Sequence, residues 1–247
     1  MSSSVVTYTP TLVPLPWDSE QFGFAAARLD HLQSETAESI AALVVAARKQ
    51  HIRHLCARIP VDDMATIHAL EAAGFQLLDG IQTFEMELPA VLPEPPANVR
   101  LFQPSDLEAV LELARTAYVH DRFHADSALS REQADRVHET WMRNSCVGGA
   151  ADAVIVAVHP DTGDPSAYVT CELGGSIGII VLVATSRIAR GLGLARAVTL
   201  GALSYFKQQR CNRVRVGTQL RNIPASRLYE ACGFQLLSVR LTYRKLL

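Results

Sequence analysis

Two glycines in a short loop are the first sign of chemistry in this chain. Residues 190–195 read Arg-Gly-Leu-Gly-Leu-Ala and follow an apolar run, residues 177–185, with the length of a buried strand. After the loop, residues 195–209 have the apolar spacing of an amphipathic helix. Glycine lets the main chain close around a bulky anion, and the first N–H groups of a helix are unpaired and carry about half a positive charge. A strand, a glycine loop and a helix in this order therefore predict a phosphate site.

Two common phosphate loops do not fit this spacing. A P-loop needs Lys and then Ser or Thr after its last glycine, and no Lys follows here. A dinucleotide fingerprint needs a small residue three positions after the second glycine, where the chain has Arg196, and an acid about 20 positions later, which is missing. The loop does match Arg/Gln-x-x-Gly-x-Gly/Ala, through Arg190, Gly193 and Ala195.

This pattern resembles the GNAT superfamily of acyl-CoA-dependent N-acyltransferases, whose members hold the CoA diphosphate with such a loop. The resemblance implies an α/β (α+β) GNAT fold with a mixed, mostly antiparallel central sheet flanked by helices, and acetyl-CoA as cosubstrate. It also implies that the cosubstrate lies against the loop and against the strand before it. The residues concerned are Val183, Ala184, Thr185, Arg190, Gly191, Leu192, Gly193, Leu194 and Ala195.

A second motif concerns the proton for the leaving group. Residues 222–234 read Asn-x-x-Ala-Ser-x-Leu-Tyr-x-x-x-Gly-Phe, which closely resembles the GNAT segment with an acid tyrosine and an asparagine that contacts CoA. The resemblance gives these roles to Tyr229 and Asn222. A phenol with a pKa of about 10 is protonated at pH 7 and can donate to the thiolate, while a main-chain N–H at residues 183–185 would polarise the thioester carbonyl. The alternative for Tyr229 is an ordinary half-buried helix tyrosine.

A charged segment is the candidate for the acceptor side. Arg122-Phe-His-Ala-Asp126 lies where GNAT enzymes usually shape the acceptor site. Together with an aromatic turn at residues 17–23, it resembles the branch of dTDP-fucosamine (4-amino-4,6-dideoxygalactose) N-acetyltransferases. The resemblance implies a nucleotide-linked amino-deoxysugar near Arg122, His124 and Asp126, although the segment is equally compatible with a surface turn. The base for the amine is left open between Glu172, His124 and a water relay.

Composition indicates a globular chain with an uneven charge. The 247 residues are 49% hydrophobic and 19% charged, with a net charge of −2. From Arg187 to the end there are 12 Lys and Arg and a single acid, Glu230, which favours a polyanionic partner. We favour the phosphates of CoA or of a nucleotide-sugar over nucleic acid, because the basic segment holds the glycine loop and lacks interleaved exposed aromatic residues.

The remaining features favour the cytoplasm. Five cysteines are scattered and contain no Cys-x-x-Cys pair, which argues against a disulfide framework and against zinc. His51 and His54 would fall on opposite faces of a strand, so we expect no metal. Residues 1–8 show no signal peptide, and no apolar run approaches the ~20 residues of a membrane span.

The order of the expected elements suggests a domain boundary. Residues 89–96 contain four prolines and cannot continue a helix or a sheet. We expect an N-terminal domain at residues 1–90, a linker at 91–98 and a catalytic domain at 99–247. The expected order of elements in the catalytic domain is α, α, β, β, β, α, β, α, β, which is the order found in GNAT domains.

An internal repeat relates the two parts. Residues 70–78 (Leu-Glu-Ala-Ala-Gly-Phe-Gln-Leu-Leu) and 229–237 (Tyr-Glu-Ala-Cys-Gly-Phe-Gln-Leu-Leu) agree at seven of nine positions. Each copy ends an expected helix and enters a strand, so residues 24–88 resemble the later half of the same fold. The first copy lacks the glycine loop and has Leu70 in place of Tyr229. We therefore expect a degenerate half-GNAT domain before a complete one.

These observations predict an N-acyltransferase that moves an acetyl group from acetyl-CoA to a primary amine by direct attack. The expected acceptor is a nucleotide-linked amino-deoxysugar, with no nucleic-acid or membrane partner. The alternatives are the same chemistry on a protein N-terminus, an amino acid or a polyamine, a non-catalytic acyl-CoA-binding module, and a nucleic-acid-binding module that uses the basic end. A homodimer is compatible with the fold, because edge strands of such sheets often pair.

Overall fold

The computed structural model describes residues 9–247, so the expectation that residues 1–8 are not a signal peptide falls outside the described part. The chain divides into two compact units. Unit 1 consists of Met1–Ile81, Ala125–Leu129 and Val239–Leu247, and unit 2 of Gln82–His124 and Ser130–Ser238. Strands β4 (Gln76–Glu87) and β10 (Gln235–Leu246) contribute residues to both units. No helix in the described residues is long and apolar enough to cross a membrane.

Unit 1 is built on a mixed sheet. Its strands follow the order β1-β2-β3-β10, in which β2 and β3 are parallel and the other neighbours are antiparallel. Apolar side chains of these strands and of helix α2 form one core around Leu29, Ile40 and Leu55. The elements are β1 (Thr11–Pro14), α1 (Pro16–Phe22), β2 (Ala26–Asp30), α2 (Ala37–Lys49), β3 (His54–Pro60) and α3 (Met64–Ala72).

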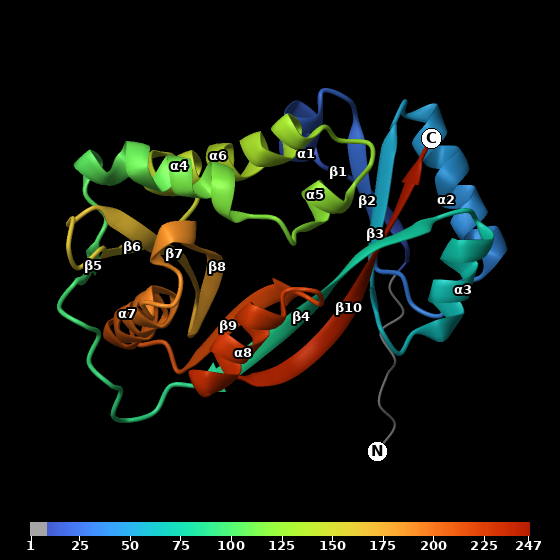
Figure 1. The fold of residues 1–247 in the computed structure, drawn as a ribbon. Coiled ribbons are helices and arrows are strands. Elements are labelled where there is room, and N and C mark those ends of the chain that lie inside the picture. The colour runs from blue at the N-terminus through green and yellow to red at the C-terminus, as the bar shows by residue number, and fades with distance from the viewer. Residues whose placement is uncertain (1–8) are drawn as a thin grey trace, which may run out of the picture. The chain divides into compact units, whose positions relative to one another are not determined.

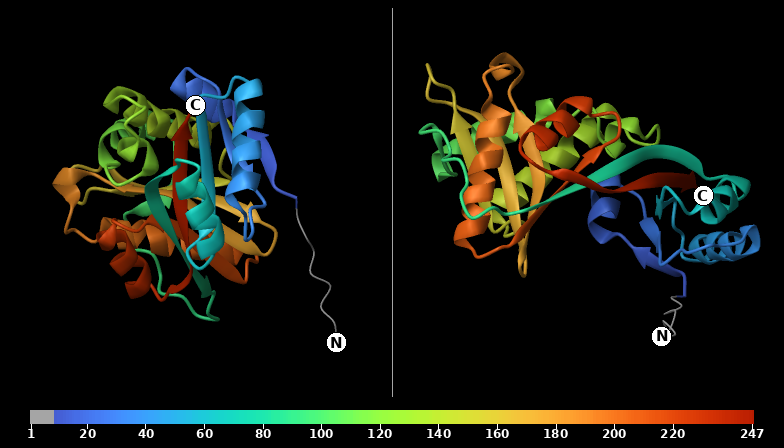
Figure 2. Two further views of the ribbon diagram at one scale, coloured as in Figure 1. Left: turned by 90° about the vertical axis from the view of Figure 1, so that its right-hand side faces the viewer. Right: turned by 90° about the horizontal axis from the view of Figure 1, so that it is seen from below.

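Unit 2 has helices on both faces of its sheet (Figures 1 and 2). The strand order is β9-β8-β7-β6-β5, with β8 and β9 parallel and the other neighbours antiparallel. One core, around Val169 and Val198, lies under α7, and another, around Val110, Met142 and Tyr168, lies under α4 and α6. Tyr168 and Val169 of β7 enter opposite cores, because successive side chains of a strand point to opposite faces. The elements are β5 (Val99–Leu101), a 3-10 turn (Pro104–Asp106), α4 (Leu107–Ala117), α5 (Arg122–Ala125), α6 (Arg131–Val147), β6 (Ala153–Val158), β7 (Pro165–Gly174), β8 (Ile177–Thr185), a 3-10 turn (Arg187–Ala189), α7 (Leu194–Gln208), β9 (Arg213–Gln219) and α8 (Ile223–Ala231).

The predicted fold class is confirmed, since the sheet is mixed, mostly antiparallel and flanked by helices. Strand β5 and the short helix α5 are additions to the expected order of elements. The proline-rich segment at residues 91–98 lies within unit 2, and unit 1 includes the end of the chain. A division at 1–90, 91–98 and 99–247 therefore stays a prediction.

The two copies of the internal repeat have the same local structure. Helices α3 and α8 are each followed by a glycine with positive φ, 79° at Gly74 and 94° at Gly233. The next residue donates its N–H to the helix in both copies, and its side chain is buried, at Phe75 and at Phe234. Each copy also contains a parallel strand pair, β2 with β3 and β8 with β9. This likeness supports the prediction of a half-length copy in the first part of the chain.

A buried ionic cluster fixes residues 125–129 in unit 1. The carboxylate of Asp126 lies 2.7 Å from Nε2 of His54 and 2.9 Å from Nη2 of Arg244, and all three residues are buried. Burial opposes the ionisation of Asp126, but hydrogen bonds from His54 and from a backbone N–H outweigh it and lower the pKa of the carboxyl. The expectation that His51 and His54 share a strand is wrong, because β3 begins at His54 and His51 lies in the preceding turn with a φ of 56°.

We expect Asp126→Asn to lower the free energy of unfolding by about 3–5 kcal/mol, because Arg244 would remain buried without a counter-charge. Urea unfolding followed by circular dichroism measures this loss. The matched control is Asp30→Asn, since Asp30 pairs with Arg28, whose side chain is 43% exposed. The control should lose only about 0–1 kcal/mol. Equal losses of unfolding free energy in the two variants would contradict a stabilising role for the buried contact between Asp126 and Arg244.

Candidate functional site

The glycine loop joins β8 to α7, as predicted. Gly191 and Gly193 have φ of 84° and 75°, a backbone conformation that favours glycine, and a Cβ on either residue would stand in open space. Within residues 9–247, no side chain caps the N-terminus of α7, where the first helical residue is Leu194. The N–H groups of this first turn can therefore donate hydrogen bonds to a bound anion. Arg190, at the start of the loop, is exposed.

Among the described residues, no strand pairs with one edge of β8 in the half that leads into this loop. It pairs with β9 only as far as Ile180, whereas its pairing with β7 continues to Thr185. The N–H of Leu182 donates to Oγ1 of Thr170 on β7, over 3.0 Å. Because backbone groups point to alternate sides along a strand, the N–H groups of Val183 and Thr185 face the edge that β9 has left.

This edge and the loop fit an extended ligand with a diphosphate. Oγ1 of Thr185 is buried and has no hydrogen-bond partner within the described part of the chain. Buried polar groups normally have a partner in the protein, in ordered water or in a ligand, so this hydroxyl can accept or donate one further hydrogen bond. The backbone edge, the orphan hydroxyl and the uncapped helix follow one another along the chain, in the order that the pantetheine arm and the diphosphate of acetyl-CoA would need.

Tyr229 projects from α8 into the core of unit 2. Its ring lies 6.0 Å from that of Phe84 and 5.9 Å from that of Phe234, measured between centroids, and the residue is 3% exposed. Burial raises the pKa of the phenol well above its ordinary value, so the hydroxyl keeps its proton at neutral pH. Asn222 caps the same helix by accepting the N–H of Ala225 over 3.3 Å. In this fold Asn222 thus starts the helix that carries Tyr229.

Two further tyrosines, Tyr118 and Tyr168, contact each other in unit 2. The hydroxyl of Tyr168 donates to that of Tyr118 over 3.1 Å, and Tyr168 pairs with Ala184 of β8. Burial first, and then Tyr168 and Tyr229, raise the pKa of Tyr118. The ring of Tyr118 also stacks on that of His138, with centroids 4.0 Å apart. The two tyrosines therefore connect strand β7 to helix α6.

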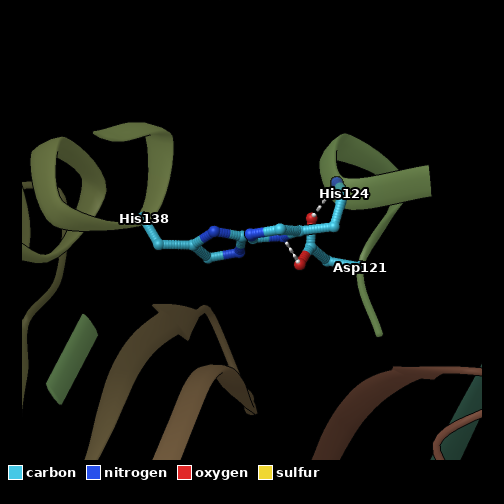
Figure 3. Close-up of side chains that lie close together, drawn as sticks. All are labelled: Asp121, His124 and His138. Atoms are coloured by element: carbon cyan, nitrogen blue, oxygen red, sulfur yellow. Dashed lines mark hydrogen bonds and ion pairs between the residues drawn. The ribbon is translucent and has the colours of Figure 1, made fainter. Parts of the chain in front are cut away.

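Four side chains next to Tyr118 form what we call the Asp-His cluster: Asp121, His124, Asp135 and His138. Nδ1 of His124 lies 2.5 Å from Oδ2 of Asp121, and its Nε2 lies 2.8 Å from Oδ1 of Asp135 (Figure 3 shows Asp121, His124 and His138). Nδ1 of His138 lies 3.3 Å from the carbonyl oxygen of Ala134. Asp121 and His138 are buried, and the side chain of His124 is 11% exposed.

The charges in the Asp-His cluster follow from these contacts. The hydrogen bond to Asp121 exceeds the effect of burial and raises the pKa of His124. Burial opposes the ionisation of Asp121, but His124 and His138 outweigh it and lower the pKa of Asp121 to about 2. Burial lowers the pKa of His138, which is therefore neutral at pH 7. His124 is an imidazolium between two carboxylates, so neither of its nitrogens accepts a proton from an amine in this arrangement.

One side chain links the Asp-His cluster to the helix of Tyr229. Arg221 donates to the carbonyl oxygens of His120 and Asp121, over 3.0 and 2.8 Å. Arg221 directly precedes the cap of α8, Asn222. The segment that carries Asp121 is therefore fixed to the start of α8.

The structure does not bring all the predicted acceptor residues together. His124 joins the Asp-His cluster, and the guanidinium of Arg122 lies over the ring of Phe123. Asp126 belongs to unit 1, where its carboxylate binds His54 and Arg244. Glu172 pairs with Ile179, four residues before Val183, and burial and then Asp152 raise its pKa. The sequence prediction for these four residues as one acceptor group stays untested.

Sequence reasoning missed most of the Asp-His cluster. A signal was present, because Asp121-Arg-Phe-His124 and Asp135-Arg-Val-His138 repeat the spacing Asp-x-x-His. Residues three apart on a helix lie on the same face, so each segment presents an acid and an imidazole together. The contact of His124 with Asp135, from the other segment, depends on tertiary packing and has no such signal.

We expect Gly193→Ala to weaken acetyl-CoA binding about tenfold, because a left-handed alanine costs about 1–2 kcal/mol and shifts the loop from the anion-binding conformation. Isothermal titration calorimetry gives the Kd. Gly163→Ala is the matched control, since Gly163 has a φ of 76°, lies in the β6–β7 turn and has equally open space around its Cβ. A similar Kd for both variants would show that the loop does not bind the cosubstrate.

Comparison with known proteins identifies a family, two relatives and a solved structure that this chain resembles. Residues 107–234 match the acetyltransferase (GNAT) family. The chain is 30% identical, over 72% of its length, to the spore coat polysaccharide biosynthesis protein SpsD of Bacillus subtilis, and 30% identical, over 70% of its length, to the mycothiol acetyltransferase of Thermobispora bispora. The matches span 61% and 60% of those two proteins. A GCN5-related N-acetyltransferase from Sphaerobacter thermophilus has a similar fold, with a TM-score of 0.67 and 16% identity, over 96% of this chain and 76% of that one.

Proposed function

The chain belongs to the acetyltransferase (GNAT) family, and on this premise we propose that it transfers the acetyl group of acetyl-CoA to a primary amine by direct attack. The observation that carries the proposal is the unpaired edge of β8, which leads directly into a glycine loop and an uncapped helix. A free strand edge suits the amide groups of pantetheine, and the helix N-terminus suits the diphosphate. Arg190, next to the loop, adds positive charge.

The proposed reaction uses few protein groups. The N–H of Val183 polarises the thioester carbonyl, and the amine attacks the carbonyl carbon. The C–N bond forms, the C–S bond breaks, and the thiolate takes the proton of the Tyr229 hydroxyl. The proton lost by the amine passes to solvent and Tyr229 is reprotonated, so the sum of the steps is an amide and free CoA.

We propose the amine of a nucleotide-linked amino-deoxysugar as the acceptor. The similarity to SpsD, a protein named for polysaccharide biosynthesis, supports a sugar substrate, and the basic end of the chain suits its diphosphate. The similarity to mycothiol acetyltransferases favours a second class, the amine of a small thiol compound. A cytoplasmic setting is part of the proposal, supported by five scattered cysteines that contain no Cys-x-x-Cys pair, and so is a homodimer.

A thiol-release assay with a panel of amines tests the proposal. The panel contains dTDP-4-amino-4,6-dideoxygalactose, other amino sugars and their nucleotides, amino acids, a polyamine and a peptide N-terminus. We expect the nucleotide-linked amino-deoxysugars to release CoA fastest. If acetyl-CoA binds in calorimetry and no amine raises thiol release above hydrolysis, the chain is a binding module and the proposal fails.

A further inference from the structure

We propose that Asp121, His124 and His138 form a binding site for a divalent transition-metal ion of the zinc class. One ligand atom from each residue lies within 4.8 Å of the other two. The two imidazoles and the carboxylate converge in Figure 3, from the segment before α6 and from α6 itself. The prediction of no metal rested on the cysteine spacing and on His51 and His54, whereas these three residues meet only in the folded chain.

In each histidine, the ring nitrogen that would point away from the ion has a hydrogen-bond acceptor, as in known metal sites. A histidine that binds a metal usually donates its second N–H to a carboxylate or a backbone carbonyl, which fixes the ring and its tautomer. Here Nε2 of His124 contacts Asp135, and Nδ1 of His138 contacts the carbonyl of Ala134. These contacts leave Nδ1 of His124 and Nε2 of His138 as the metal ligands.

The carboxylate of Asp121 is also oriented by hydrogen bonds. Oδ1 of Asp121 accepts the N–H groups of Phe123 and His124, over 2.8 and 3.1 Å. Oδ2 is thereby directed at Nδ1 of His124, where a proton now joins the two atoms. The metal ion would displace this proton and bind both atoms, with His138 as the third ligand.

The donor set and the dimensions suit zinc. Two histidines and one carboxylate form the protein ligands of several catalytic zinc sites and leave a position open for water. Zinc bonds of about 2.0–2.2 Å place tetrahedral ligand atoms about 3.3 Å apart, so side-chain rotations would widen the 2.5 Å contact between Asp121 and His124 and draw His138 in from within 4.8 Å. The site is also well supported, because Tyr118 stacks on His138 and Arg221 holds the backbone at Asp121. A bound ion would fasten the segment before α5 to helix α6.

Metal binding by the whole chain, without any acetyl-transfer assay, tests this inference. We would dialyse purified protein against Zn²⁺ and measure bound zinc by mass spectrometry, then substitute Co²⁺ and record its absorption spectrum. We expect one ion per chain with a spectrum of nitrogen and oxygen ligands. In Asp121→Asn and in His138→Ala we expect at least a tenfold loss of affinity, in line with the removal of one ligand. His120→Gln, a change at an exposed histidine next to the cluster, should bind as the unchanged protein does.

Asp121→Asn keeps a side-chain oxygen for the N–H groups of Phe123 and His124, so it tests the ligand role without removing this turn. Circular dichroism establishes that the variants are folded. We also expect Zn²⁺ to raise the Tm of the unchanged protein and to leave the Tm of Asp121→Asn unchanged. Absence of stoichiometric zinc, or zinc binding that neither variant weakens, would overturn the inference and leave the cluster as an imidazolium between two carboxylates. Neither result depends on the proposed acetyl transfer.

Discussion

Replacing Tyr229 with phenylalanine is expected to lower kcat about 100-fold, with little change in the Kd of acetyl-CoA. The phenol keeps its proton at neutral pH because burial raises its pKa, so it can supply a proton to the departing thiolate. Phenylalanine retains the ring contacts with Phe84 and Phe234, so the fold should be unchanged. Because the hydroxyl acts in the transition state, kcat and kcat/KM should fall by the same factor.

The control for this variant is Tyr205→Phe. Tyr205 lies on α7, and its hydroxyl is 3.5 Å from the carbonyl oxygen of Asp152. Removal of that hydroxyl should leave turnover unchanged. Steady-state thiol release and calorimetry with both variants give the comparison. Full turnover by Tyr229→Phe would remove Tyr229 as the acid and leave it as a core residue.

Replacing Val183 with proline is expected to have a larger effect, a loss of about 10²–10³-fold in kcat, which is typical of removing one oxyanion donor. Proline has no N–H, and the N–H of Val183 faces the unpaired edge of β8. The substitution therefore removes no ladder bond, and proline is tolerated where the N–H faces away from the sheet. The loss should appear in kcat, with a smaller change in the affinity for acetyl-CoA.

Val183→Ala separates the contribution of the backbone N–H from that of the side chain. It keeps the N–H and removes most of the side chain, so its turnover should stay within a few-fold of the unchanged enzyme. Circular dichroism and thermal unfolding establish that both variants are folded. A folded Val183→Pro enzyme with normal kcat would place the oxyanion donor elsewhere.

The parts that the sequence predicted well depend on local backbone geometry. Residues 190–195 were expected to form a glycine loop between a strand and a helix, and Gly191 and Gly193 have the positive φ that glycine favours there. Tyr229 lies on the expected helix, which ends at Ala231, and Gly233 follows two residues later with a positive φ. Such features follow from a few neighbouring residues, because turn and cap geometry restrict which residue types fit.

The parts that the sequence did not predict depend on tertiary contacts. His54 meets Asp126, which is 72 residues away in the chain, so neither residue looks special in its own segment. The stacking of Tyr118 on His138 arises because α4 and α6 pack on the same face of the sheet. The compact units combine distant parts of the chain for the same reason, since β10 adds the end of the chain to unit 1.

A crystal structure of the protein with CoA is the most direct test of the central claim. We predict that the diphosphate binds the N–H groups of the glycine loop and of the first turn of α7. We also predict that the pantetheine arm lies along the free edge of β8 and that the sulfur is within hydrogen-bond reach of the Tyr229 hydroxyl. CoA bound at another surface, or a sulfur remote from Tyr229 with the loop unoccupied at saturating CoA, would contradict the account.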